Sequence, residues 1–142
     1  MAWTAAQVVT PQGAYLAKFI DSMNVSNHWE ASQHVAWFSG LPNNANASAG
    51  VATHCSAFAA SVAERLGVYL LRPPQHSQIL LANAQTAWVN SSAGQTLGWT
   101  VLPGPLQAQA LANQGFLVLF LRRNADPHKP GQYFNPGSYI GV

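Results

Sequence analysis

The order of the predicted elements indicates an α+β fold, in which N-terminal helices pack on a small antiparallel sheet built late in the chain. Three observations predict this fold. Helical patterns fill most of the first two thirds, the most apolar run lies near the C-terminus, and short runs with strand character follow it. The 142 residues are enough for one domain with its own core, and no internal repeat or linker divides them. We therefore expect a single domain over residues 1–142.

The helices are predicted from capping residues and from the spacing of apolar side chains. Thr10 followed by Pro11 is typical of an N-cap with proline at the first helical position. Thr53 is a second candidate N-cap, and Gly67 is a natural residue to follow the end of that helix. The predicted helices cover residues 11–23, 55–66, 77–89 and 106–113, with a further short helix between 24 and 42. In the third of these, the apolar side is expected to hold Ile79, Leu80, Ala84 and Trp88.

The strands are predicted from short apolar runs bounded by turn residues. Phe116–Leu121 is the most apolar run, and its length and composition predict a central strand buried on both faces. Shorter strands are expected at 99–102, 132–134 and 138–142, and turns at 90–94, 122–131 and 135–137.

The composition excludes several classes of partner. Only 7% of the residues are charged, against a usual value of about 25%. The net charge is +2, and Arg122-Arg123 is the only cluster of basic residues, so we expect no nucleic-acid partner. No apolar stretch approaches the roughly 18 residues that a membrane helix needs, so we expect no membrane partner.

The single cysteine and the N-terminal residues limit the compartment and the cofactors. One cysteine excludes an internal disulfide and a zinc site built from several thiolates, and no tight spacing of ligands predicts another metal site. We expect no cofactor. The residues after Met1 lack a charged segment followed by a long apolar one, so no signal peptide is predicted. Work in the periplasm or cell wall would therefore require a different export route.

Cys55 is the residue whose position points most directly to chemistry. It is expected in the first turn of a helix, among backbone N–H groups that have no partner within the helix. That environment favours the thiolate over the thiol, and the thiolate is the nucleophile. The alternative interpretation is that Cys55 is only a small buried apolar residue.

Three stretches of the chain resemble the NlpC-like and CHAP-like cysteine amidases of the papain-like fold. The resemblance is strongest to the small amidase effectors that bacteria deliver by type VI secretion. The stretches are His54-Cys55-Ser56-Ala57-Phe58 running into Leu66-Gly67-Val68, Ala108-Gln109 through Val118, and the hairpin Asp126-Pro127-His128-Lys129-Pro130-Gly131. They span about residues 52 to 131 in the order that the family has.

The resemblance implies a function and a mechanism. The Cys55 thiolate would attack an amide carbonyl of a peptidoglycan stem peptide, and a histidine from the sheet would act as general base and then as acid. The implied partners are the peptidoglycan peptide and an immunity or delivery protein. Family members usually continue through further strands, so we expect Val142 to end the chain short of the full family domain.

The chain departs from the family where the histidine is expected. Gln132 occupies that position after the hairpin, and a second alignment places Ser138 there instead. His128, in the same hairpin, is the best substitute for the base. His54, His76 and Gln132 are then expected to contact the substrate.

Two other hypotheses about the function of the chain stay open. The first is a binding module of the same fold that keeps the cleft but has lost the base, and that recognises cell-wall peptides or glycans. The second is a fragment that needs a missing segment or a partner to complete its sheet. Trp29, Trp37, Trp88 and Trp99 could supply a sugar- or peptide-binding surface, although most are expected in the core.

Overall fold

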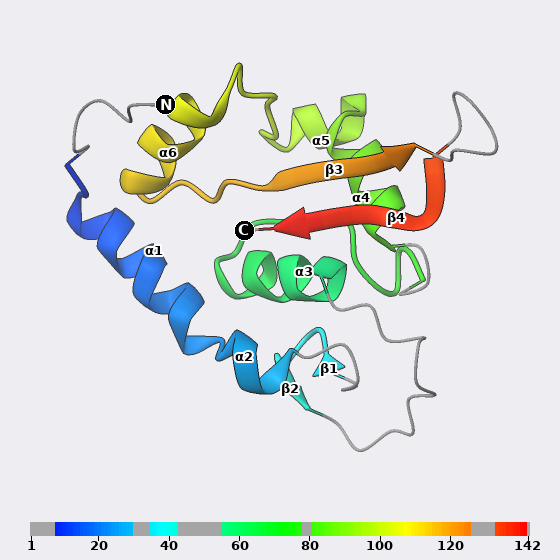
Figure 1. Ribbon diagram of the computed structural model, residues 1–142, viewed down its shortest axis with the longest axis horizontal. Helices are drawn as coiled ribbons and strands as arrows, with labels where there is room; N and C mark the ends of the chain where they lie inside the picture. The colour runs from blue at the N-terminus through cyan, green and yellow to red at the C-terminus, as the bar shows by residue number, and fades with distance from the viewer. Residues whose placement is uncertain (1–7, 30–34, 43–54, 78–80, 126–132, 142) are drawn as a thin grey trace. The chain divides into compact units, whose positions relative to one another are not determined.

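The computed structural model describes residues 8–29, 35–42, 55–77, 81–125 and 133–141 (Figure 1). In chain order the elements are α1 (Pro11–Ser22), α2 (Val25–His28), β1 (Val35–Ala36), β2 (Leu41–Pro42), α3 (Cys55–Arg65), α4 (Leu81–Val89), α5 (Ser92–Thr96), α6 (Pro105–Asn113), β3 (Phe120–Ala125) and β4 (Tyr133–Gly141). The described part is therefore a helix-rich mixture of helices and antiparallel strands, as expected. It falls into two compact units, one with α1 and α6 and the other with the remaining elements. That the whole chain forms one domain stays a prediction.

In the first unit, α1 begins as its sequence predicts and packs closely on α6. The Thr10 side chain accepts a hydrogen bond from the Gly13 N–H at 3.1 Å, which caps the helix, and Pro11 opens it. The backbone N–H and the hydroxyl of Thr10 both donate to the carbonyl of Asn113, each at 2.9 Å. Gly13 is buried, and a Cβ at this position would overlap the Asn113 carbonyl. The absence of a side chain therefore lets the two helices approach closely.

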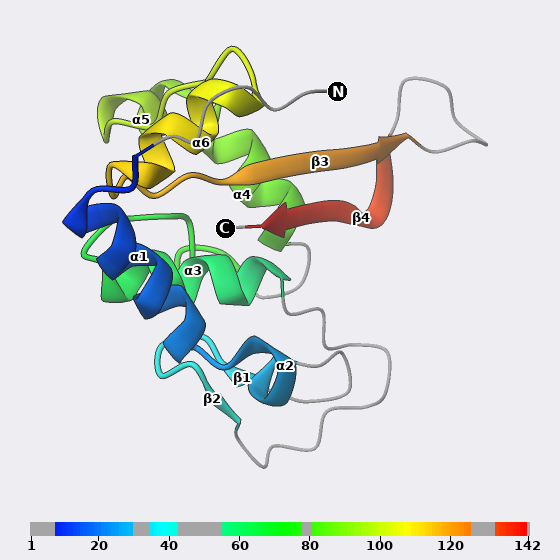
Figure 2. The same ribbon diagram turned by 60° about the vertical axis from the view of Figure 1, so that its left-hand side comes forward.

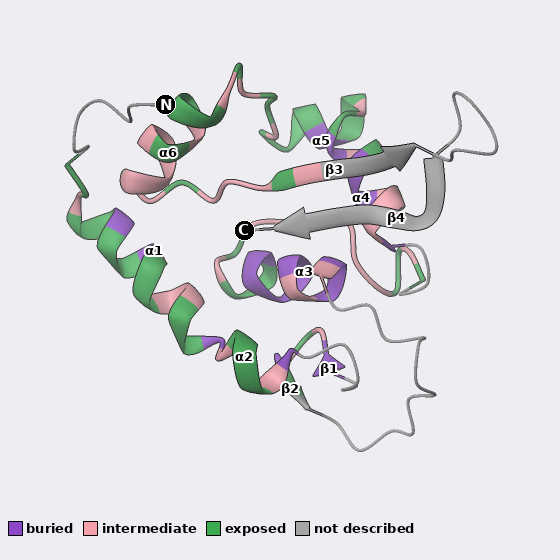
Figure 3. Ribbon diagram, viewed as in Figure 1, coloured by how far each residue is buried: buried purple, intermediate pink, exposed green. Residues whose placement is uncertain are grey.

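In the second unit, the core is built around α3. Its buried residues are small or β-branched, and they cover most of the circumference of the helix (Figure 3): Ser56, Ala57, Ala59, Ala60, Ser61, Val62 and Ala63. Small side chains allow neighbouring backbones to approach, and both α4 and β4 pack against α3. α4 also packs against β4. These contacts place α3 and α4 on β4, one strand of the antiparallel pair.

β3 and β4 form an antiparallel pair with an irregular register. Phe120 pairs with Gly141 and Arg123 with Ser138, but Ala125 pairs with Tyr133. The extra residues of β4 between these last two pairs form a bulge. β4 and α3 run side by side in the same direction, so both elements start on the same side of the unit (Figures 1 and 2).

The predicted central strand is wrong in its position and its burial. β3 begins at Phe120, and Phe116 and Phe120 are 56% and 69% exposed rather than buried. The backbone N–H of Phe116 bonds to the carbonyl of Leu111, so this residue completes the end of α6 and is not available to a strand. Among the described strands β3 pairs with β4 alone, so it does not have the strand neighbour on each side that a central strand has.

Two further predictions near the C-terminus are corrected. Residues 135–137 do not form a turn that separates two strands, because β4 is continuous and takes these residues into its bulge. A bulge tolerates proline, because its extra residue makes no ladder hydrogen bond. The predicted turn at 122–131 is also wrong for 122–125, which continue β3, while 126–131 lie outside the described residues.

The region between α4 and α6 also differs from the prediction. The expected turn at 90–94 contains the start of α5, which Ser91 caps by accepting from the Gly94 N–H at 3.3 Å. The expected strand at 99–102 is absent from the structure, because the Trp99 N–H bonds back to the Gly94 carbonyl and closes the end of α5. The predicted helix at 77–89 is helical from Leu81 onward; Ser77 is not helical, and 78–80 lie outside the described residues.

Candidate functional site

Cys55 is the first residue of α3, as the sequence predicts, and it is half-buried. The other end of the helix is also as expected. Gly67 has a φ of +71°, and the N–H of Val68 bonds to the carbonyl of Ala63 at 2.9 Å, which closes the last turn. The expected N-cap, Thr53, lies outside the described residues, so its role stays a prediction.

The first turn of α3 is held from α4 by Gln85. The Nε2 of Gln85 donates to the carbonyl of Ser56 at 3.1 Å and to the carbonyl of Leu71 at 2.9 Å. Gln85 has no exposed surface, and Ser56 is buried as well. This residue fixes the backbone next to Cys55, although the sequence pattern does not predict a role for it.

Gln85 was not predicted to be buried because the apolar side predicted for α4 lies one residue before the side that is buried in the structure. The buried residues are Leu81, Gln85, Thr86 and Val89, whereas Ala84 and Trp88 are only half-buried. The sequence does hold a signal: Leu81, Gln85 and Val89 recur every four residues, which places a polar amide in the middle of an apolar face. A polar side chain at such a position is expected to have buried hydrogen-bond partners.

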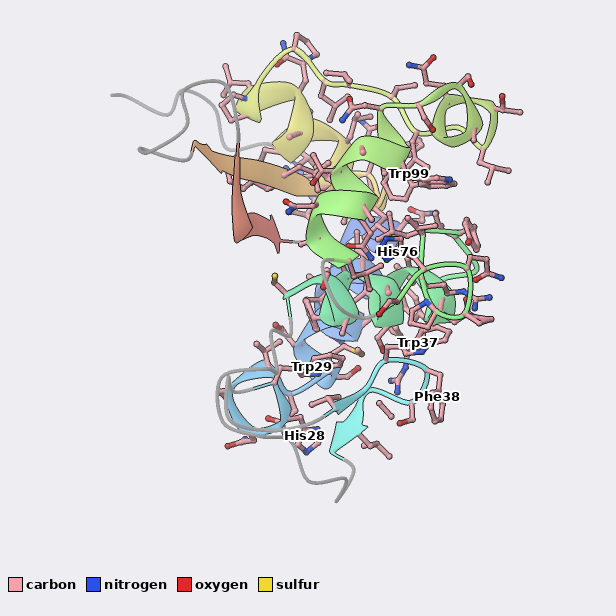
Figure 4. All side chains as sticks on the ribbon, turned by 90° about the vertical axis from the view of Figure 1, so that its right-hand side faces the viewer. His28, Trp29, Trp37, Phe38, His76 and Trp99 are labelled. Atoms are coloured by element: carbon pink, nitrogen blue, oxygen red, sulfur yellow. The ribbon has the colours of Figure 1, made fainter. Side chains whose placement is uncertain are left out.

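His76 lies on the segment between α3 and α4 and is half-buried (Figure 4). Its Nδ1 is 2.7 Å from the carbonyl oxygen of Ser77, and its backbone N–H donates to the carbonyl of Arg72 at 3.1 Å. Both partners belong to the same segment of chain. His28, at the end of α2, lies in a different part of the unit from His76 (Figure 4).

The other predicted site residues, His54, His128 and Gln132, lie outside the described residues. The structure does place the elements that flank them. Cys55 follows His54 directly, and His128 and Gln132 belong to the connection between β3 and β4. β4, which follows Gln132 in the chain, starts on the side of the unit where α3 starts (Figures 1 and 2).

Arg72 lies between aromatic rings on the segment after α3. Its guanidinium carbon is 4.8 Å from the centroid of the Trp37 ring and 5.5 Å from that of Tyr69. Its Nε is 3.0 Å from Oε2 of Glu64, in the last turns of α3. Trp37 contacts Phe38 edge-to-face, and Phe38 is 67% exposed at the turn between β1 and β2 (Figure 4).

Of the other tryptophans, Trp29 is in the core, and Trp88 and Trp99 are half-buried. Trp29 is buried and packs edge-to-face on Phe58 at 5.2 Å, which confirms the core interpretation for this residue. Trp88 is half-buried and packs on Tyr69 at 5.3 Å. Trp99 is half-buried, and its indole N–H donates to the Tyr69 carbonyl at 2.8 Å.

No family model, curated protein or solved structure matches this chain. In the ranges that the structure describes, no group of three or more His, Cys, Asp or Glu residues is arranged to hold a metal ion. None of the described helices combines the length and the apolar character that crossing a membrane requires.

Proposed function

We propose that this chain is a cysteine amidase or endopeptidase of papain-like fold that hydrolyses amide bonds in peptidoglycan stem peptides. The position of Cys55 at the start of α3 carries the proposal. Its side chain is half-buried, whereas seven of the ten residues that follow it in the helix are buried. The N-terminus of a helix favours negative charge, so it supports the oxyanion that forms during amide hydrolysis.

The arrangement of α3 and β4 supports the same proposal. The family that the sequence resembles combines a nucleophile at a helix start with a histidine from an adjacent antiparallel sheet. Here β4 packs on α3, and both start on the same side of the unit. His128 and Gln132 precede Tyr133, the first residue of β4, by five residues and by one.

In the proposed reaction, His128 takes the proton of the Cys55 thiol and the sulfur attacks the carbonyl carbon of the amide. N–H groups at the start of α3 hold the oxyanion. The C–N bond then breaks, the amine leaves with the proton from the imidazole, and the acyl group stays on sulfur as a thioester. Water, deprotonated by the same histidine, hydrolyses the thioester to a carboxylic acid and restores the thiol. His54, His76 and Gln132 contact the substrate.

Mass spectrometry of peptidoglycan fragments incubated with the chain in ¹⁸O-labelled water tests the proposal. We expect new fragment pairs that carry one heavy oxygen in the new carboxyl group. Cys55→Ala should abolish them, and Ser92→Ala, an equally small change at an exposed position on α5, should leave them unchanged. Absence of labelled fragments with the parent chain at every substrate tested contradicts the proposal.

The alternative is a binding module of the same fold. Gln132 stands where the resembled family has its histidine, and glutamine cannot accept a thiol proton near neutral pH. The exposed ring of Phe38 beside Trp37 offers a surface for a peptide or glycan. Calorimetry with intact fragments separates the two functions: binding without cleavage, unaltered by Cys55→Ala and lost in Phe38→Ala, supports the module.

A further inference from the structure

Gln85 makes a pair of hydrogen bonds that fixes its orientation. A side-chain amide has two N–H groups, and here both partners are backbone carbonyls, those of Ser56 and Leu71. Since a carbonyl can only accept, Nε2 must be the atom that faces them. Oε1 of Gln85 is buried and has no hydrogen-bond partner.

These two bonds join three segments of the second unit. Ser56 belongs to the first turn of α3, Leu71 to the chain that follows α3, and Gln85 to α4. One nitrogen binds both carbonyls, so the chain after α3 must return to the start of that helix. The ends of helices open more easily than their middles, and a buried bond from another element opposes this opening.

We propose that Gln85 is a positioning residue for Cys55. By holding the Ser56 carbonyl, it keeps the first turn of α3 formed, and so it fixes the place of the sulfur relative to the N–H groups of that turn. Gln85 acts through the backbone and does not touch the reacting atoms. Its importance in catalysis rests on the proposed function, whereas its effect on the thiol does not.

Alkylation of the only cysteine tests the proposal directly. The rate of reaction with iodoacetamide is measured from pH 6 to pH 9 in the native chain and in the same chain unfolded in urea, and the two are compared as a ratio. In Gln85→Met we expect this ratio to move about fivefold toward one, which corresponds to the loss of about 1 kcal/mol of hydrogen bonding. The Met side chain has similar length but no donor.

Thr86→Val is the matched control. Thr86 is the next residue of α4 and is also buried, but its hydroxyl donates to the Ala82 carbonyl of its own helix at 2.8 Å. The control loses a side-chain hydrogen bond without losing a connection to α3, so its alkylation ratio should equal that of the parent. Equal ratios for Gln85→Met and Thr86→Val overturn the proposal, as does a ratio of one at every pH in the parent.

Hydrogen exchange in the parent chain covers the case in which Gln85→Met does not fold. The amides of Ala59 and Ala60, which bond to the first turn of α3, should exchange as slowly as those of Val62 and Ala63. Much faster exchange at Ala59 and Ala60 overturns the proposal. Alkylation and hydrogen exchange need no substrate, so they decide the role of Gln85 even if no amide hydrolysis is found. The absence of hydrolysis would count against the proposed function and not against the role of Gln85.

Discussion

The guanidinium of Arg72 lies over the ring of Trp37, with 4.8 Å between its central carbon and the ring centroid. This contact joins the turn between β1 and β2 to the segment that follows α3. The same guanidinium contacts Tyr69 and pairs with Glu64, so one side chain connects the β1–β2 hairpin with both the end of α3 and the chain beyond it.

Replacing Arg72 should therefore destabilise the second unit. We expect Arg72→Ala to lower the free energy of unfolding by about 1–2 kcal/mol, mostly through lost contact with the rings, since the partly exposed ion pair adds little. Arg72→Lys should recover only part of the loss, because an ammonium cannot stack as a planar guanidinium does. Urea unfolding followed by tryptophan fluorescence measures this, with Lys18→Ala as an exposed control on α1. Unchanged stability in Arg72→Ala would refute the prediction.

Two glycines should respond differently to the same substitution. Gly13→Ala brings a Cβ onto the Asn113 backbone, and we expect a loss of about 1–3 kcal/mol from overpacking. Gly67→Ala meets no atom within 4 Å, so its cost should be limited to the left-handed backbone, about 1 kcal/mol. Thermal or urea unfolding of the two variants ranks them. A Gly67 variant that is the less stable of the two would contradict the close approach of α1 and α6.

His128→Ala tests the proposed general base. If His128 accepts the thiol proton, turnover of a peptidoglycan peptide should fall by about 10²–10⁴-fold, the usual contribution of such a base. His28→Ala, a histidine change at the end of α2, should leave turnover unchanged. Full activity in the His128 variant would assign the base elsewhere, with His54 and His76 the next to test.

Gln132→His tests the alignment of the hairpin. If Gln132 faces Cys55 from the start of β4 and His128 does not act as the base, the new imidazole should raise the rate of amide hydrolysis by a factor of about 10²–10⁴. Gln114→His, the same exchange at an exposed position after α6, should have no effect. A folded Gln132 variant that equals the parent in rate would count against this alignment and favour the one that places Ser138 at the histidine position.

The predictions that the structure confirms depend on short-range interactions. Thr10 and Pro11 start α1, and Gly67 follows the end of α3, because a cap needs only the few residues around it. The start of α3 at Cys55 follows from the same local pattern, so the best candidate for a nucleophile could be found without a structure.

The predictions that the structure corrects depend on which segments meet in space. The run Phe116–Leu121 is apolar enough for a central strand, but β3 begins only at Phe120, pairs with β4 alone among the described strands, and leaves both Phe116 and Phe120 exposed. The side of α4 that was predicted to be buried differs by one residue from the side that is buried. The apolar periodicity predicts a helix, but which side of the helix faces the core depends on the elements that pack against it.

The sequence by itself determined the start of α3, the capping of α1 and the presence of a single thiol, because these follow from local backbone chemistry and composition. Only the tertiary structure decided that Gln85 reaches the carbonyl of Ser56 and that Arg72 reaches Trp37. Those contacts join residues 29 and 35 positions apart in the chain. Their formation depends on how α3, α4 and the β1–β2 hairpin pack, which local propensity does not encode.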